Sequence, residues 1–227
     1  MRKRLSTETI YVAWYVRPRG TLRTELLAAL RQARNARRPR SRGTDRRGPL
    51  LHMTLIADRP AEVASRTVPG HWEGDLIKGA RHGSAVGTLV ERTTRLVILA
   101  RMDGTDATSA REGFTKKLQH VPAPLRKTLT YDRDKEMAEH ERLAQRLAIQ
   151  VFVADPHSPW QRGTHENTNG LLRQYLLKGT DLSGYTQREL NAIAHRLNTR
   201  PRKCLDFATP LEVCTQLRQH SPVALGS

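Results

Sequence analysis

The chain has no long hydrophobic run and few cysteines. Its 227 residues contain no stretch of 18 apolar side chains. The basic start is not followed by the apolar segment that a signal peptide would have. The two cysteines, Cys204 and Cys214, are too few for a disulfide framework and lack the paired spacing of a zinc site. The sequence therefore predicts a soluble, cytoplasmic protein with two free thiols and no membrane partner.

Acidic and aromatic side chains are also scarce. Aromatic residues make up 5% and hydrophobic residues 37%, which is lean but compatible with a globular core. Lys and Arg number 39 against 22 Asp and Glu, a net charge of +17, and residues 1–70 alone hold 16 basic and 5 acidic side chains. Such a surface attracts phosphate backbones in a salt-dependent way, so we expect a polyanionic partner. The alternative is a charge that only keeps the chain soluble.

Composition divides the chain into four regions. Residues 1–34 contain leucines at helical spacing, which predicts a basic helical N-terminal segment. Residues 35–70 are rich in Arg, Gly and Pro and are interpreted as a basic linker, with a short strand at 51–57. Residues 71–215 have the regular pattern of a catalytic core, and residues 216–227 form a tail.

The order of elements within the core indicates its fold. Three strands joined by short turns predict an antiparallel meander, and the later strands alternate with helices, which implies parallel pairing and right-handed crossovers. We expect strands at 72–78, 85–93, 95–102, 127–131 and 149–154, and helices at 106–119, 135–148, 163–177 and 186–199. This order predicts an α/β, ribonuclease-H-like domain, with a mixed five-stranded sheet and helices on both faces.

Three acidic residues lie on elements that this fold brings together. Asp75 is in the first strand, Asp132 ends the fourth, and Glu166 is near the start of the helix after the fifth. Taken singly, such an acid is more often a turn former, a cap or a helix-dipole contact. Their order together predicts a catalytic site for Mg²⁺, which prefers oxygen ligands and for which Mn²⁺ can substitute. Two ions about 3.5–4 Å apart would support in-line displacement at phosphorus.

Further polar residues are candidates for supporting this site. Period-2 alternation puts Glu73 on the strand face of Asp75, where a place beside the metal and a solvated strand edge are equally good explanations. Helical spacing puts Asn169 and Arg173 on the face of Glu166, which suits a helix lying against a DNA backbone. The alternative for this helix face is simple exposure to solvent.

Basic side chains are the expected contacts to phosphate groups. Such contacts position a nucleic acid without reading its sequence. The candidates near the predicted site are Arg162, Arg173, Lys178, Arg200, Arg202 and Lys203, and those in the linker are Arg37, Arg38 and Arg40. The linker is equally well explained as a solvated spacer, and both roles can hold at once.

Several stretches of the core carry the motifs of a known family. The longer ones are HWEGDLIKG at 71–79, GTLVERTTR at 87–95, SPWQRG at 158–163 and ENTNGLLRQY at 166–175. Shorter ones are KGTDLS at 178–183, NxRPR at 198–202 and TPLEV at 209–213. Together they resemble bacterial insertion-sequence transposases of the DDE type, specifically the insertion-sequence-thirty family, over residues 5 to 215.

The resemblance implies a function and a site. It implies that Asp75, Asp132 and Glu166 are a catalytic triad in a retroviral-integrase-like core. It implies a DNA transposase that cuts at terminal inverted repeats and joins the freed 3′-hydroxyls to target DNA. A homo-oligomer associated with the bacterial nucleoid is expected by the same analogy.

The chain also departs from the family pattern. Members usually carry a longer N-terminal region with a helix-turn-helix, and the resemblance implies that residues 1–34 are a remnant of this helical DNA-binding region. Asp134 stands where the family usually has glycine and adds negative charge beside the expected metals. One alternative is therefore a truncated, weak or inactive DNA-binding remnant that modulates a full-length transposase. Another is a ribonuclease-H-type nuclease that hydrolyses RNA in hybrids without joining strands.

Overall fold

The computed structural model describes most of the chain after the linker. The described residues are 53–132, 137–155, Ser158, Gln161 and 163–220, with Gly20, Thr21 and Glu25 before them, and without the side chains of 218–220. The chain divides into two units, Met1–Asp45 and Arg46–Ser227, and every element below belongs to the second. Most of the predicted N-terminal helix, the linker arginines Arg37, Arg38 and Arg40, and the core residues Asp134 and Arg162 lie outside the described residues.

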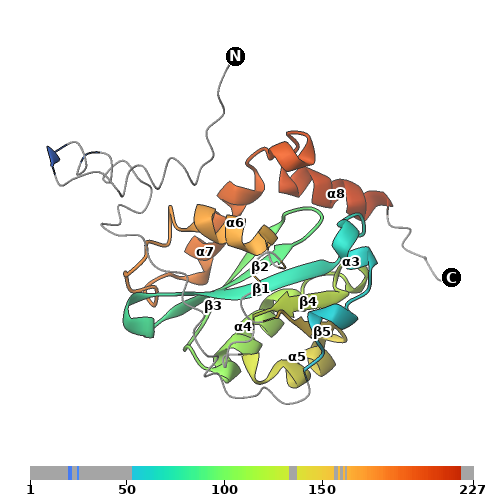
Figure 1. Cartoon of the computed structure of the whole chain (residues 1–227), viewed down its shortest axis with the longest axis horizontal. Helices are drawn as coiled ribbons and strands as arrows, with labels where there is room; N and C mark the ends of the chain where they lie inside the picture. Colours follow the sequence, from blue (N-terminus) through green and yellow to red (C-terminus); the bar gives the residue numbers. More distant parts are fainter. Residues whose placement is uncertain are drawn as a thin grey trace. The chain divides into compact units, whose positions relative to one another are not determined.

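A mixed five-stranded sheet forms the centre of the second unit (Figure 1). Its strands are β1 His71–Lys78, β2 Ala85–Glu91, β3 Val97–Arg101, β4 Thr128–Tyr131 and β5 Gln150–Val153, in the order β3-β2-β1-β4-β5. The first three pair in antiparallel fashion, and β4 lies parallel to both β1 and β5. The predicted meander and the parallel crossovers are both confirmed.

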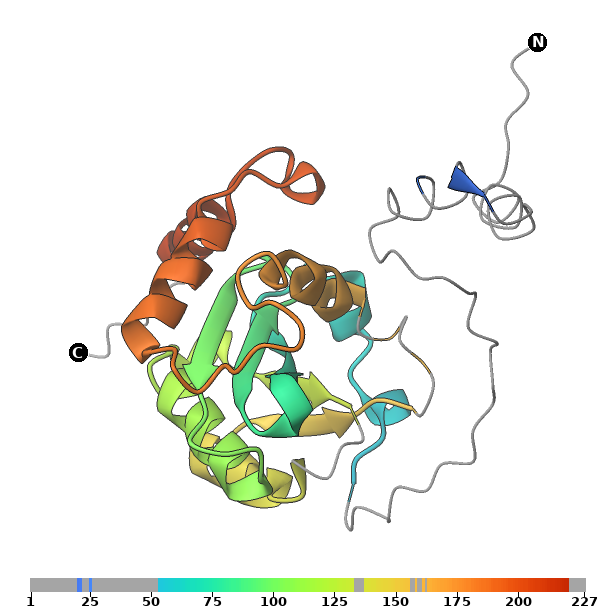
Figure 2. The same cartoon turned by 90° about the vertical axis from the view of Figure 1, so that its left-hand side faces the viewer.

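Helices cover both faces of this sheet (Figure 2). One face carries α4 Ala107–Leu118 and α5 His140–Leu147, and the other carries α6 Gly163–Leu172 and α7 Gln187–Asn198. The helix α8 Pro210–His220 contacts α7, and the single-turn elements are η1 Ile56–Asp58, α3 Glu62–Ser65, η2 Ala80–His82, η3 Ala123–Leu125 and η6 Lys203–Leu205. None of the described helices is long and apolar enough to cross a membrane.

Each face of the sheet has its own hydrophobic cluster. The cluster under α4 and α5 is the larger and includes Trp72, Leu89, Phe114, Leu129 and Leu143. The cluster under α6 and α7 includes Ile77, Val86, Leu172, Leu190 and Leu197. Strand alternation explains this division, because successive side chains of β1 point to opposite faces.

Glycine lets α4 approach the sheet closely. A Cβ atom on Gly87 in β2 would overlap Met102 Cε and lie 2.8 Å from Phe114 Cε1. The interior is therefore packed to the point where one added methyl group has no space.

The free edge of β3 is covered by the two ends of α7. Asn198 accepts a hydrogen bond from the Val97 amide and donates one to the Val97 carbonyl, each at 2.8 Å. Gln187 accepts from the Arg101 amide and donates to the Leu99 carbonyl, each at 2.9 Å. Thr186 and Glu189 form a capping box at the start of α7, which fixes where this helix begins.

Some sequence expectations were wrong. The predicted strand at 51–57 is reduced, in its described part, to an isolated bridge between Leu55 and Val153, and Ile56 already begins a 3-10 turn that Pro60 follows. Within the described residues, the helix expected at 135–148 begins at His140, and the one expected to reach 177 ends at Leu172. As expected, neither Cys204 nor Cys214 forms a disulfide within the described part of the chain.

The helix α8 was not predicted, and it runs across the expected boundary at 215. Pro210 opens it in the first position, where its fixed φ suits a helix and its missing N–H is not needed. Thr209 and Glu212 form reciprocal hydrogen bonds, from the Thr209 amide to Glu212 Oε2 and from the Glu212 amide to Thr209 Oγ1. The sequence Thr-Pro-Leu-Glu was therefore a capping signal that could have been recognised.

Candidate active site

The parallel pairing of β1 with β4 sets the positions of two of the predicted acids. The register pairs Glu73 with Thr130, and Asp75 and Asp132 each stand two residues further along. Neighbouring strands lie about 4.8 Å apart, so this register carries the two aspartates to the same level of the sheet. Both are half-buried, and the side chain of Asp75 is 28% exposed.

The helix α6 crosses this part of the sheet and contacts Asp75 directly. Asn169 Nδ2 donates to Asp75 Oδ2 at 3.1 Å, and His165 Nδ1 lies 3.5 Å from the same oxygen. The helix also contacts β1 and β2. Glu166 lies one helical turn before Asn169 and is exposed. It is therefore on the same face of α6 as Asn169, the residue that contacts Asp75.

The carboxylates are not gathered into one cluster. Among the described residues, no three His, Cys, Asp or Glu side chains lie close enough together to hold a metal ion. The donor chemistry nonetheless fits a divalent cation, because Asp75, Asp132 and Glu166 all offer accessible carboxylate oxygens. Asn169 Oδ1 is buried there and has no hydrogen-bond partner among the residues that the structure describes, which is an unusual state for an amide oxygen.

His165 connects the candidate site to β2. Its side chain is 2% exposed, and its Nε2 lies 2.5 Å from Thr88 Oγ1. Thr88 also donates to the backbone carbonyl of Asp75 at 3.2 Å. These contacts with Asp75 and Thr88 make His165 part of the framework of the site.

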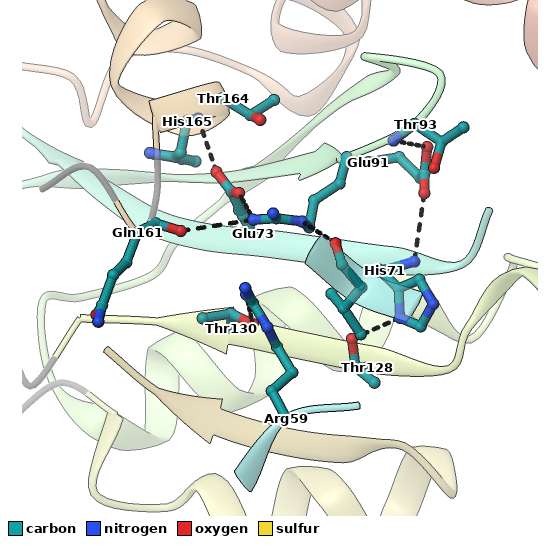
Figure 3. Close-up of polar contacts among 12 residues, drawn as sticks. Arg59, His71, Glu73, Glu91, Thr93, Thr128, Thr130, Gln161, Thr164 and His165 are labelled. Carbon is teal, nitrogen blue, oxygen red and sulfur yellow. Dashed lines mark hydrogen bonds and ion pairs between the residues drawn. The ribbon is translucent and has the colours of Figure 1, made fainter. Parts of the chain in front are cut away.

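Glu73 is buried at the start of α6 (Figure 3). Its side chain is fully buried, which excludes the solvated strand edge. One carboxylate oxygen pairs with Arg92 Nη1, and the other accepts the backbone N–H of His165 at 2.8 Å. Glu73 thus satisfies a first-turn donor of α6 and places a negative charge at the positive end of its dipole. Arg92, from the turn after β2, is the partner that makes this burial tolerable.

The predicted phosphate contacts fall into two groups. Arg173 and Lys178 follow α6, where Arg173 Nη1 donates to the Leu176 carbonyl at 3.4 Å and Lys178 is exposed. Arg200, Arg202 and Lys203 lie between α7 and α8; Arg202 is half-buried and the other two are exposed. All five are therefore accessible, but they come from two different connections.

Comparison with known sequences gives one family. The sequence profile of the integrase core domain matches residues 65–159. The chain is 61% identical to the transposase for insertion sequence element IS1086 of Cupriavidus metallidurans, covering 94% of this chain and 63% of that protein. It is 43% identical to transposase InsI for IS30A of Escherichia coli, covering 92% and 55%, and 37% identical to the transposase for IS4351 of Bacteroides fragilis, covering 98% and 68%.

Comparison with solved structures confirms the fold. A chain of the simian T-cell lymphotropic virus intasome superposes with a TM-score of 0.53 at 18% identity, over 70% of this chain and 57% of that one. The catalytic core domain of BIV integrase superposes with a TM-score of 0.50 at 18% identity, over 66% and 96%. The predicted ribonuclease-H-like, retroviral-integrase-like sheet is thus the fold of this core.

Proposed function

Because the chain belongs to the insertion-sequence-thirty family of bacterial transposases, we propose that it is the catalytic core of a DNA transposase. It cleaves DNA at the ends of an element and joins the 3′-hydroxyls to target DNA. The chain spans 63% and 55% of the length of the first two relatives.

One observation carries the proposal. The β1–β4 register leads Asp75 and Asp132 to the same level, and Asn169 fastens α6, the helix of Glu166, onto Asp75. These contacts support a site to which two adjacent strands and one crossing helix each contribute a carboxylate, on a strongly basic protein. A polyanionic substrate and an oxygen-rich metal site are the combination that phosphodiester chemistry requires.

Asp75, Asp132 and Glu166 are the residues that would hold the metal, which we propose to be two Mg²⁺ ions or Mn²⁺ in their place. When bound, such ions activate an attacking oxygen and stabilise the leaving oxygen of an in-line displacement at phosphorus. The chain's own residues orient the ligands. Asn169 and His165 restrain the Asp75 carboxylate, and Glu73 fixes the first turn of α6.

The partners follow from the same chemistry. We propose that the substrates are the terminal inverted repeats of an element and a target DNA, both of which the net charge of +17 attracts. Two ends must be joined in one event, so we also propose that the chain acts as a homo-oligomer.

Strand transfer tests this proposal. A pre-cleaved element end is incubated with plasmid and Mg²⁺ or Mn²⁺, and joined product is compared for the wild type, Glu166→Gln and Glu141→Gln. Glu141 is exposed on α5, so its variant removes the same charge from the opposite face. We expect Glu166→Gln to lose more than about 100-fold in joining, since even residues that only orient metal ligands contribute 10–100-fold. Glu141→Gln should match the wild type.

Each other outcome points elsewhere. Undiminished joining by Glu166→Gln would remove Glu166 from the site. Salt-sensitive DNA binding with no joining by the wild type would favour the inactive DNA-binding remnant. Hydrolysis of RNA in hybrids without any joining would favour the nuclease.

A further inference from the structure

Five arginines from four separate segments gather around the start of α6. Arg59 follows η1, Arg66 ends α3, Arg92 and Arg95 lie in the turn between β2 and β3, and Arg202 lies between α7 and α8. We call them the arginine cluster. Only Arg202 among them was expected from the sequence to contact phosphate.

Hydrogen bonds of Arg59 and Arg92 connect the segments that carry the first three members. Arg92 Nε donates to the Val63 carbonyl of α3 at 3.3 Å, three residues before Arg66. Arg92 also pairs with Glu73, whose register partner Thr130 accepts a hydrogen bond from Arg59 Nη1 at 3.4 Å (Figure 3). Arg59 and Arg66 therefore both lie near Arg92.

The other two members lie where α6 begins. Arg95 Nη1 donates to Thr164 Oγ1, in the first turn of α6, at 2.6 Å. Asn198, at the end of α7, is bonded to Val97, two residues beyond Arg95. Arg202 Nη2 donates to the carbonyl of Leu197 at 3.2 Å, which holds Arg202 at the same end of α7.

The cluster members repel one another. Burial, followed by the charge of Arg92, lowers the pKa of Arg59 to about 10. Burial also lowers the pKa of Arg92 and of Arg202, and the charge of Arg95 contributes in both cases. Glu73 counteracts this effect on Arg59 and Arg92, but it is a single carboxylate. The folded chain thus holds positive charges together at an electrostatic cost.

Backbone strain and unsatisfied donors mark the same place. Arg66 and Arg95 have φ of 56° and 62°, in the left-handed region that only glycine adopts without cost. The Nε atoms of Arg95 and Arg202 are buried and have no hydrogen-bond partner in the described part of the chain. Strained residues and unpaired buried donors tend to occur where a ligand binds.

We propose that the arginine cluster binds successive phosphate groups of one DNA strand and leads that strand to the carboxylates beside α6. Arg66, Arg95 and Arg202 are half-buried and can reach phosphate, whereas Arg92 is buried and supports them. Glu73 already satisfies a first-turn N–H donor of α6. The positive charge that attracts phosphate must therefore come from side chains. This inference rests on the proposed function, because it takes the polyanion to be DNA.

The test is the salt dependence of DNA binding. Fluorescence anisotropy with a labelled element-end duplex gives Kd at several salt concentrations for the wild type, Arg66→Asn, Arg95→Gln and their double variant. Each lost phosphate contact should lower the slope of log Kd against log salt by about 0.9. The matched control is Arg146→Gln, which removes one exposed charge on α5, on the other face of the sheet. Its slope should equal that of the wild type.

A thermal melt of each free protein separates binding from folding. Asn tolerates the left-handed backbone and carries no charge, so Arg66→Asn should melt at or above the wild-type temperature while binding DNA more weakly. Slopes for Arg66→Asn and Arg95→Gln that equal those of the wild type or of Arg146→Gln would overturn the inference.

Binding and joining fail independently. A wild type that joins strands while the cluster variants keep its salt slope would leave the transposase standing and overturn the arginine cluster. If the wild type joins no strands, yet the cluster variants have a smaller salt slope than the wild type, the arginine cluster would stand and the transposase activity would be overturned.

Discussion

The two faces of β1 have opposite kinds of interior. Trp72 and Gly74 face the cluster under α4, where a Cβ on Gly74 would meet Leu129, Leu89 and Phe114. Glu73 and Asp75, their neighbours in the same strand, face α6 and are held by hydrogen bonds and an ion pair. One face gains stability from area removed from water, which requires no particular direction. The other fixes the position of a helix, and it does so by burying charge.

This difference separates stability from function. An apolar contact tolerates exchange for another side chain of similar size, because the driving force is not directional. A buried carboxylate tolerates no such exchange while its arginine partner stays in place. The α6 face should therefore be the more sensitive of the two to a change of charge, and the α4 face the more sensitive to a change of volume.

The largest effect is expected from Glu73→Gln. The amide keeps the shape of the side chain but leaves Arg92 buried without its counter-charge, so the free energy of unfolding should fall by about 3–5 kcal/mol. Denaturant unfolding measures it. The double variant Glu73→Gln with Arg92→Gln should recover a large part of the loss. A loss below about 1 kcal/mol for the single variant would show that the ion pair does not stabilise this face.

A smaller effect is expected on the other face from Gly87→Ala. The added methyl group forces Met102 and Phe114 to move, and overpacking of this kind costs about 1–3 kcal/mol. Gly184→Ala is the control, because a Cβ there meets nothing within 4 Å. Unfolding of both variants at one pH measures the difference. Equal stabilities would mean that the interior under α4 adjusts to the added volume, and that this face is not sensitive to a change of volume.

The smallest effect concerns His71, on the polar face of β1. Burial, followed by the charge of Lys127, lowers the pKa of His71, so folding favours the neutral ring. The resulting stability is fully present above the ordinary histidine pKa of about 6.5 and is lost as the pH falls through the lowered value. Glu62 Oε1, 3.5 Å from Nε2, limits the loss. Between about pH 7 and pH 5, the free energy of unfolding should fall less steeply for His71→Asn than for the wild type. Parallel curves of this free energy against pH would contradict the prediction.

Local patterns predicted the sheet, because they reflect local forces. Alternation and turn residues located all five strands. The alternation of strands with helices predicted parallel pairing, and the parallel pairing of β4 with β1 brings Asp132 to the level of Asp75. The strand expected at 51–57 failed because, in its described part, a single bridge at Leu55 is all that pairs with β5. Its apolar residues satisfied the pattern without a partner strand to complete it.

The polar framework of the site could not be predicted in this way. Glu73 was correctly assigned to the face of Asp75, but its partners are Arg92 and the amide of His165, which are distant in sequence. No periodicity records such a contact, so burial and exposure at Glu73 were equally good explanations until the fold was known. The contacts of His165 could not be predicted for the same reason, since Thr88 and Asp75 lie far from it in sequence and meet it only through the packing of α6.

The amide side chains at the two ends of α7 have a consequence for how copies of the chain can meet. An exposed strand edge is a template on which another chain can extend the sheet. At β3, Asn198 and Gln187 already occupy the backbone groups of Val97, Leu99 and Arg101. A second copy that approached this edge would find its hydrogen-bonding groups taken. Self-association there must be built from helix and loop surfaces, and the same amides guard the chain against edge-to-edge aggregation.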